Sequence, residues 1–446
     1  MKSILILGAG LSASSLIRYL LQNSEANQWT VAVCDKDLKL VQSKLGNHPN
    51  GKALNFNALD ASERRPYIEE ADLVISMLPA RFHIDIAKDC IELKKDLITP
   101  SYVSKEMRAL SKQAEEAGII IMNEIGVDPG IDHMSAMRII DEIHAKGLKL
   151  EAFRSFCGGL IAPESDNNPW NYKFTWNPRN VVLAGSGGAA SFIRNSRYKY
   201  IPYHRLFDRL DHMTVEGYGD FTGYPNRDSL SYRSIYSLDY IPTIYRGTLR
   251  RPGYCEAWSV FVELGITDDS YEMTEINNSS PRQFLNAFLP FHPGKTVEEK
   301  FKEFLRPERL HLYERFEWLG LFDHEPLLNI ENPTPARLLE HILVGKWALE
   351  KDDKDMLVMI HEFEFNDNGQ NKKITSSMVN IGEDQVYTSM SNTVGLPVAI
   401  CTKLILQDKI TLKGVQLPIK PEIYNPILDE LETFGIQFVE KEEILN

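Results

Sequence analysis

The chain has few cysteines and lacks a long hydrophobic run. The five cysteines among its 446 residues are scattered, and no two of them have the spacing of metal ligands. They indicate neither a disulfide framework nor a zinc site, and we predict no bound metal. No apolar run reaches the roughly 18 residues that a membrane span needs, and Ile4–Leu7 is too short for a signal peptide. From these absences we expect a cytoplasmic protein.

The chain also lacks an excess of basic residues. With 49 Lys and Arg against 62 Asp and Glu, its formal net charge is −13. Nonspecific binding to nucleic acids or acidic membranes requires clustered positive charge, so we expect neither partner. A composition of 43% apolar and 25% charged residues is that of an ordinary globular protein, and the length predicts two or three domains.

Apolar runs alternate with helical patterns through the first part of the chain. We expect strands at Ser3–Leu7, Thr30–Cys34, Ala71–Leu78, Asp96–Thr99 and Gly118–Asn123. Alternating strands and helices predict a parallel sheet with helices on both faces. Right-handed crossovers then place all the carboxyl ends of these strands on one edge.

The pattern changes after residue 128. Residues 150–280 are richer in aromatic and β-type segments, which predicts an α+β layer, and residues 281–350 become helical again. A hairpin is expected from Leu357–Phe365 and Lys373–Glu383, followed by a helix near Pro397–Gln407.

A glycine-rich turn, Gly8-Ala-Gly-Leu-Ser-Ala13, follows the first strand and opens a helix. A side chain at Gly8 would hinder the tight turn, and one at Gly10 would keep the backbone away from a pyrophosphate. The small Ala13 lets helix and strand pack closely, and the phosphates would meet free N–H groups at the positive helix end. The turn predicts dinucleotide binding, the alternative being a doubly wound domain that has lost its ligand.

Two aspartates bear on the choice of cofactor. Asp35 ends the second strand, where a carboxylate bonds the ribose hydroxyls of NAD and would repel the 2′-phosphate of NADP. Lys36 follows and softens that repulsion, so either cofactor fits, and NAD is favoured. Asp60 lies beside the adenine or in a solvated turn, and Asp35 can equally be an ordinary strand-end residue.

Other polar side chains follow strands of the same expected sheet. Tyr102 and Asp128 come after different strands, and because the carboxyl ends share an edge, both should converge on the reactive end of the cofactor. The alternatives are a buried Tyr102 with a satisfied hydroxyl and an Asp128 that caps the following helix. We expect His133 to be structural rather than catalytic.

The middle of the chain offers further candidates. Cys157 precedes two glycines that would let a ligand approach the backbone, although a buried cysteine beside glycine is usually inert packing. Gly185–Gly188 resembles a phosphate loop without its Lys-Ser/Thr, and we interpret it as a turn. Arg227 and Arg246–Arg251 stand out in an acidic chain as carboxylate-binding candidates, the alternative being solvated surface arginines.

Five blocks along the chain carry one resemblance. They are Glu124-Ile-Gly-Val-Asp-Pro-Gly-Ile-Asp-His133, Phe156-Cys-Gly-Gly-Leu-Ile-Ala-Pro-Glu164, Asn168-Pro-Trp-Asn-Tyr-Lys-Phe-Thr-Trp176, Tyr224-Pro-Asn-Arg-Asp-Ser229 and Thr393-Val-Gly-Leu-Pro397. In this order they resemble the saccharopine dehydrogenases of the L-glutamate-forming type, also called saccharopine reductases. Five separate blocks are far more specific than the glycine turn.

The resemblance implies an α/β fold with a Rossmann-type doubly wound parallel sheet, a mixed-sheet α+β domain and a small helical insertion. The dinucleotide-binding domain would comprise residues 1–128 and about 391–446. Residues 129–280 and about 351–390 would bind substrate and form a homodimer, and residues 281–350 would be the insertion.

The resemblance also assigns residues to roles. Saccharopine would be held by Ser101, Tyr102, Asp128, Arg227, Thr248, Leu249 and Arg250. By the same resemblance the cofactor would lie near Gly8, Ala9, Gly10, Leu11, Asp60, Thr99, Val127, Asp128, Pro129 and Asn177. The turn and the second strand themselves add Ala13 and Asp35 to these cofactor candidates. The fungal members use NADP and carry an arginine where this chain has Asp35-Lys36, so the resemblance leaves the cofactor open.

The implied reaction interconverts saccharopine with glutamate and aminoadipate semialdehyde, in lysine synthesis or breakdown. Our hypothesis is that Tyr102, Asp128 and Cys157 orient the water and share its protons. One alternative is a related amine or imine dehydrogenase, such as a lysine 6-dehydrogenase or a carboxyspermidine-type enzyme. Another is a nucleotide-binding sensor that has lost catalysis.

Overall fold

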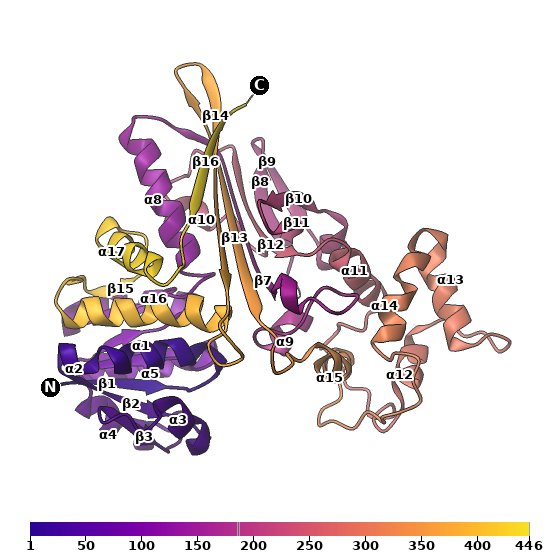
Figure 1. Cartoon of the computed structure of the whole chain (residues 1–446), viewed down its shortest axis with the longest axis horizontal. Helices are drawn as coiled ribbons and strands as arrows, with labels where there is room; N and C mark the ends of the chain where they lie inside the picture. The colour runs from indigo at the N-terminus through magenta and orange to yellow at the C-terminus, as the bar shows by residue number, and fades with distance from the viewer. Residues whose placement is uncertain (185, 187, 446) are drawn as a thin grey trace. The chain divides into compact units, whose positions relative to one another are not determined.

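The computed structural model describes residues 1–184, 186 and 188–445, which form two compact units (Figure 1). Unit 1 comprises residues 1–151, 234–238 and those from 355 onward, and unit 2 comprises residues 152–233 and 239–354. The turn expected at Gly185–Gly188 includes two positions, 185 and 187, that lie outside the described residues. The three-domain division expected from the sequence stays a prediction.

A seven-stranded parallel sheet forms the centre of unit 1, as predicted. Its strands, in spatial order, are β15 (Gly414–Gln416), β6 (Ile120–Met122), β5 (Asp96–Ile98), β4 (Leu73–Ser76), β1 (Lys2–Leu7), β2 (Trp29–Cys34) and β3 (Gly51–Leu54). Ile4–Leu7 and Leu73–Ser76 are buried throughout because helices cover both faces of a parallel sheet. The strand order reverses between β1 and β4, which is where such sheets bind ligands.

Ten α-helices accompany this sheet in the described part of unit 1. They are α1 (Ser14–Gln22), α2 (Ser24–Asn27), α3 (Leu38–Leu45), α4 (Ala61–Glu70), α5 (His83–Leu93), α6 (Lys105–Ala109), α7 (Ser111–Ala117), α8 (Ile131–Ala145), α16 (Ser389–Leu406) and α17 (Pro421–Glu432). A side chain caps the N-terminus of some of these helices: Asp37 accepts hydrogen bonds from the N–H groups of Lys39 and Leu40 at the start of α3.

Helix α16 returns from the far end of the chain and packs along α1 (Figure 1). Its length and composition would suffice to cross a membrane, but 83% of the residues in its apolar window are buried within the protein. A Cβ added at Gly395 would lie 2.8 Å from the backbone nitrogen of Leu16 and 3.0 Å from the oxygen of Ser12. Gly395 therefore lets α16 approach the start of α1 closely. The Oγ of Ser391 accepts the backbone N–H of Ser15 at 2.9 Å and fixes the same contact.

The hairpin expected from residues 357–383 is confirmed and also belongs to unit 1. Strands β13 (Asp355–Asp367) and β14 (Gln370–Ile381) pair antiparallel, and β16 (Val439–Ile444) adds a third strand. Neither β16 nor β15 was expected from the sequence, because both are short and carry little apolar periodicity.

Unit 2 contains a mixed sheet, which confirms the expected class of this part. Its strands are β7 (Leu150–Ile161), β8 (Ala190–Arg194), β9 (Arg197–Ile201), β10 (Asp211–Val215), β11 (Gly219–Pro225) and β12 (Thr243–Arg250). β12 pairs parallel with β7 and antiparallel with β11. Its helices are α9 (Pro178–Val182), α10 (Tyr232–Ile235), α11 (Tyr254–Leu264), α12 (Pro281–Phe288), α13 (Val297–Arg309), α14 (Tyr313–Trp318) and α15 (Pro335–Trp347).

The contact at Gly395 predicts a measurable loss of stability. Gly395→Ala places a methyl group against the backbone of α1, so we expect the free energy of unfolding to fall by about 1–3 kcal/mol. The matched control is Gly345→Ala in α15, where an added Cβ meets no atom within 4 Å. There the higher helix propensity of alanine should raise stability by up to about 1 kcal/mol. Chemical denaturation measures both changes, and equal effects would contradict the close contact.

Candidate active site

The glycine-rich turn of unit 1 has the geometry of a phosphate-binding turn. Gly8 has a φ of +101°, and a Cβ there would lie 3.2 Å from the backbone of Met77. Gly10 is exposed, and an added Cβ would meet open space. A 3₁₀ turn, Leu11–Ala13, then leads into α1. The backbone of this turn is therefore accessible to a pyrophosphate.

Asp35 is bonded to this turn. One oxygen of its carboxylate accepts the N–H of Ala9 at 2.8 Å, and the other accepts the N–H of Asp37 at 3.1 Å. Across the turn, the Nζ of Lys44 donates to the carbonyl of Gly10 at 2.6 Å. Burial lowers the pKa of Lys44 to about 8, while the charge of Asp35 opposes this shift. A carboxylate and an ammonium from neighbouring elements thus hold the turn together.

A buried histidine links the carboxyl ends of β4 and β5. The Nδ1 of His83 lies 2.9 Å from the Oγ of Ser76, which ends β4. Its Nε2 lies 3.0 Å from Thr99 Oγ1 and 2.8 Å from Ser101 Oγ, both after β5. Burial lowers the pKa of His83 to about 4, so the imidazole is neutral near pH 7. Thr99 and Ser101 were expected near the ligands, but His83 was missed because no motif surrounds it.

Tyr102 and Asp128 meet at this edge. The Tyr102 hydroxyl donates to Asp128 Oδ1 at 2.8 Å. Tyr102 is 49% exposed, so the alternative of a buried tyrosine is wrong. The helix after Asp128 has Gly130 as its N-cap, so the alternative of an Asp128 cap is also wrong. A phenol and a carboxylate joined by a hydrogen bond at the edge of such a sheet can act as an acid–base pair.

The loop that presents Asp128 is tightly closed. The N–H of Gly126 donates to the carbonyl of Pro129 at 2.9 Å, and the N–H of Asp132 donates to the carbonyl of Val127 at 3.0 Å. Gly130 has a φ of +145°, and a Cβ there would lie 2.1 Å from the backbone of Gly126. Only glycine fits at this position, which explains the Asp-Pro-Gly motif.

Unit 2 gathers several of its candidates on one face of its sheet. Cys157 on β7 pairs in register with Thr248 on β12, and Thr248 pairs with Tyr224 on β11. Because side chains alternate along a strand, Arg250 lies on the same face of β12 as Thr248. Leu249 points to the opposite face and is fully buried.

Arg250 is the most unusual of these residues. It is only 4% exposed, and its Nε has no hydrogen-bond partner in the described part of the chain. Its guanidinium carbon lies 5.1–5.8 Å from the ring centres of three tyrosines, Tyr172, Tyr224 and Tyr254. A buried cation with aromatic neighbours and an unused donor is suited to bind an anion.

Three other candidates are exposed, and two of them have local structural roles. Arg227 is exposed after β11, as the surface alternative expected. Asp60 is the N-cap of α4 and accepts the N–H of Ser62 at 2.8 Å. Asn177 is the N-cap of α9. The ligand contacts expected for these three residues stay predictions.

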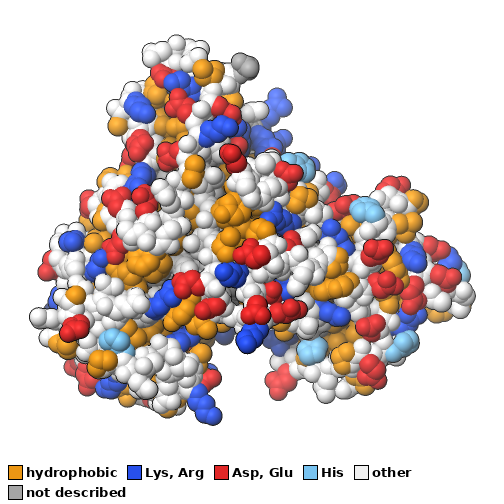
Figure 2. Space-filling model, in the orientation of Figure 1, with side chains coloured by type: hydrophobic (Ala, Val, Ile, Leu, Met, Phe, Trp, Pro, Cys, Tyr) orange, Lys and Arg blue, Asp and Glu red, His pale blue; other side chains and the backbone are white. Residues whose placement is uncertain are grey.

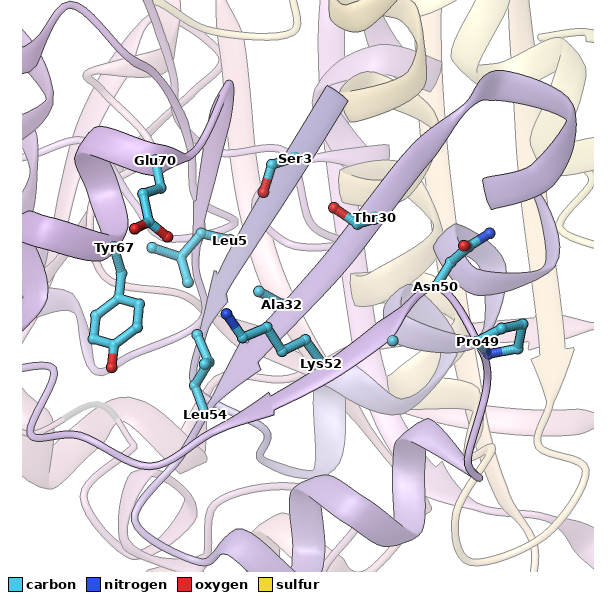
Figure 3. A pocket seen from close by; sticks show the side chains of 11 residues that line it. Ser3, Leu5, Thr30, Ala32, Pro49, Asn50, Lys52, Leu54, Tyr67 and Glu70 are labelled. Atoms are coloured by element: carbon cyan, nitrogen blue, oxygen red, sulfur yellow. The ribbon is translucent and has the colours of Figure 1, made fainter. Parts of the chain in front are cut away.

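A separate cavity of about 200 Å³ lies in unit 1 over β1, β2, β3 and α4 (Figure 3). Ser3, Thr30, Lys52, Tyr67 and Glu70 are among its lining residues. Ser3 and Thr30 lie near the amino ends of their strands, so this cavity is distinct from the site at the carboxyl ends.

On the face of the molecule shown in Figure 2, acidic and basic side chains are interspersed.

The parallel sheet, its glycine turn and the polar residues at its carboxyl edge define a dehydrogenase-type protein with a nicotinamide cofactor. The family model "Saccharopine dehydrogenase NADP binding domain" matches residues 4–122, and "Saccharopine dehydrogenase C-terminal domain" matches residues 126–436. The chain belongs to the saccharopine dehydrogenase family, which confirms the resemblance seen in the sequence.

Relatives match over the whole chain. The saccharopine dehydrogenase [NADP(+), L-glutamate-forming] of Saccharomyces cerevisiae is 35% identical over 99% of both chains. The enzyme of the same name from Schizosaccharomyces pombe is 33% identical over 100% of both. The mitochondrial alpha-aminoadipic semialdehyde synthase of Rattus norvegicus is 34% identical over 98% of this chain and 47% of its own length. A solved apo structure of the S. cerevisiae enzyme matches 99% of this chain and 100% of its own with a TM-score of 0.88.

The depressed pKa of His83 predicts a pH dependence of stability. The unfolded histidine titrates near pH 6.5 and the folded one near pH 4, so acid favours unfolding across this window. The stability that the neutral imidazole contributes is complete above about pH 6.5 and is lost as the pH falls towards 4. Between these pH values the free energy of unfolding of the wild-type protein should fall by up to about 3 kcal/mol more than that of the His83→Gln variant. Urea denaturation at several pH values measures this difference, and parallel curves would contradict a buried neutral His83.

Proposed function

We propose that this protein is a saccharopine dehydrogenase of the L-glutamate-forming type that uses NADP. The proposal rests on the full-length similarity to two fungal enzymes whose names state this reaction. Saccharopine, NADP+ and water would give glutamate, aminoadipate semialdehyde, NADPH and a proton. The related amine dehydrogenases and the inactive sensor are less favoured. The cytoplasmic location and the homodimer expected from the sequence stay predictions.

The chemistry requires a choice between two carbons of the substrate. Loss of hydride from the glutamyl α-carbon would yield an oxoacid and lysine. Release of glutamate requires that hydride leave the lysyl ε-carbon, so the pocket must present that carbon to the cofactor. Water then adds to the imine, and the carbinolamine breaks its C–N bond to release glutamate and the semialdehyde.

We assign the proton transfers to Tyr102 and Asp128. Their hydrogen bond lets one group gain a proton while the other loses one, as water addition and carbinolamine collapse both require. Cys157 remains a candidate third member because it lies beside Thr248 on the face that carries Arg250. The Arg250 guanidinium would bind a substrate carboxylate through its unused donor.

NADP is supported by the name of the matching family domain and by the names of the fungal relatives. The sequence favoured NAD because Asp35 would repel a 2′-phosphate. In the fold, however, both carboxylate oxygens of Asp35 accept backbone N–H groups. Lys36 is exposed, and the ammonium group of Lys44 lies at the same turn, where it donates to the carbonyl of Gly10. These contacts reduce the repulsion on which the expectation of NAD depended.

One assay tests the function. Consumption of NADPH is measured with glutamate and aminoadipate semialdehyde, then with ammonia in place of glutamate, and both are repeated with NADH. We expect rapid consumption only with glutamate, and faster with NADPH at limiting concentration. Equal rates with ammonia would favour a lysine 6-dehydrogenase, and a preference for NADH would overturn the cofactor assignment alone.

Replacement of Asp128 tests the acid–base pair. Asp128→Asn keeps the shape of the side chain but removes the carboxylate that accepts from Tyr102, so kcat should fall roughly tenfold or more. The affinity for NADPH, measured by fluorescence titration, should stay within about twofold because the glycine turn is intact. Unchanged turnover would remove Asp128 from this role.

Replacement of Arg250 tests the carboxylate site. Arg250→Lys keeps the charge but loses the planar fork of donors, so the KM for glutamate should rise about tenfold or more. The matched control is Arg251→Lys, the next residue, whose guanidinium donates to the carbonyl of Tyr218 at 2.7 Å. Steady-state kinetics should show little change for the control, and equal KM values for glutamate in all three proteins would exclude Arg250 from binding glutamate.

A further inference from the structure

Three buried side chains form a hydrogen-bonded chain beneath the edge of the sheet in unit 1. His133 Nε2 donates to Glu124 Oε2 at 2.7 Å, and His133 Nδ1 lies 2.8 Å from the Tyr236 hydroxyl. Their exposed fractions are 3% for Glu124, 0% for His133 and 1% for Tyr236. At this burial none of the three is accessible to a substrate in the described structure. Their influence on the reaction must therefore act through the residues that they hold.

Glu124 holds the backbone on both sides of Tyr102. Its N–H donates to the carbonyl of Ser101 at 3.1 Å. Its carboxylate oxygen Oε1 accepts the N–H of Val103 at 2.9 Å. Glu124 has a φ of +58°, a left-handed conformation that is uncommon for a residue with a Cβ. This conformation lets one residue bond both neighbours of Tyr102, which restricts where the phenol can lie.

The charge on Glu124 is maintained by its partner. Burial alone would raise the pKa of Glu124, but the hydrogen bond and the charge of His133 lower it below its usual value. The carboxylate is therefore ionised at neutral pH, and its hydrogen bond to Val103 is of the stronger, charge-assisted kind. A neutral residue in its place would hold the Tyr102 segment less firmly.

The same pair also closes the loop that carries Asp128. Glu124 precedes this loop and His133 follows it, so their bond joins the two ends of residues 125–132. The backbone bonds from Gly126 to Pro129 and from Asp132 to Val127 hold the loop from within. One buried pair thus fixes the supports of both Tyr102 and Asp128.

We propose that Glu124 and His133 are positioning residues, which set the Tyr102 hydroxyl against the Asp128 carboxylate for catalysis. This inference rests on the proposed function, because it assumes that the Tyr102–Asp128 pair transfers protons in that reaction. It assigns no contact with substrate or cofactor to Glu124, His133 or Tyr236.

A double-mutant cycle tests the proposal in the full chain. Glu124→Gln keeps an oxygen that can accept from Val103 but removes the charge, and we expect kcat to fall about tenfold with the NADPH affinity unchanged. Tyr102→Phe should lower kcat at least as much. If Glu124 acts by setting Tyr102 against Asp128, the loss of kcat that Glu124→Gln causes should be clearly smaller in the Tyr102→Phe background than in the wild-type protein. A role in general stability would instead make the two losses multiply, which would overturn the proposal.

The matched control is Glu63→Gln. Glu63 also accepts a backbone N–H, that of Asn57 at 2.8 Å, but it lies on α4 away from Tyr102. The kcat of the Glu63→Gln variant should equal that of the wild-type protein, and adding this change to Tyr102→Phe should cause no further fall in kcat.

A second variant covers the possibility that Glu124→Gln does not fold. Tyr236→Phe removes only the hydroxyl beside His133, and we expect kcat to fall about threefold, with a smaller loss in the Tyr102→Phe background. Multiplying losses in this cycle would also overturn the proposal. An inactive wild-type protein would refute the proposed reaction itself, whereas an active wild type with multiplying losses would refute only the positioning role.

Discussion

The structure of unit 1 depends on one constraint, the parallel pairing of β1, β4, β5 and β6. Parallel strands deliver their carboxyl ends to a single edge, so segments that are distant in the chain become neighbours there. Ser76 is the last residue of β4, Thr99 comes directly after β5, and Asp128 lies in the loop after β6. The neutral imidazole of His83 and the buried hydrogen bond between Glu124 and His133 then fix the spacing between these segments. The chemistry at this edge is an outcome of strand direction, and two buried histidines stabilise it by joining the segments that the strands bring together.

Much of this arrangement could be predicted from the sequence. The glycine turn follows a strand of four consecutive apolar residues, a pattern with few alternatives, and the strand–helix alternation required a parallel sheet. The convergence of Tyr102 and Asp128 could be predicted because the carboxyl ends of parallel strands share an edge, and the structure adds that β5 and β6 are neighbours there. These predictions were correct because a local sequence pattern and the geometry of a parallel sheet are enough to determine the features that they concern.

Other features depend on tertiary contacts that no local pattern encodes. His83 opens a helix in an ordinary sequence, and its role arises only when the ends of β4 and β5 lie side by side. Tyr236 reaches His133 from a five-residue segment of the chain that belongs to unit 1 although its neighbours belong to unit 2. Asp35 was expected to face a ribose, but its hydrogen bonds to Ala9 and Asp37 depend on side-chain orientation. The burial of Arg250 among tyrosines, in contrast to the exposure of Arg227, was equally beyond prediction from spacing.

The return of α16 and β15 to unit 1 has a consequence for biosynthesis. β15 pairs with β6 through contacts nearly 300 residues apart in sequence, and Gly395 on α16 fits against the first turn of α1. A nascent chain that has emerged only as far as α15 exposes the apolar surface of α1 that α16 later covers. Closing so long a loop is slow, and partly folded chains with exposed apolar surface aggregate readily. Unit 1 therefore begins to form first during synthesis but is completed only when the last segment of the chain has emerged.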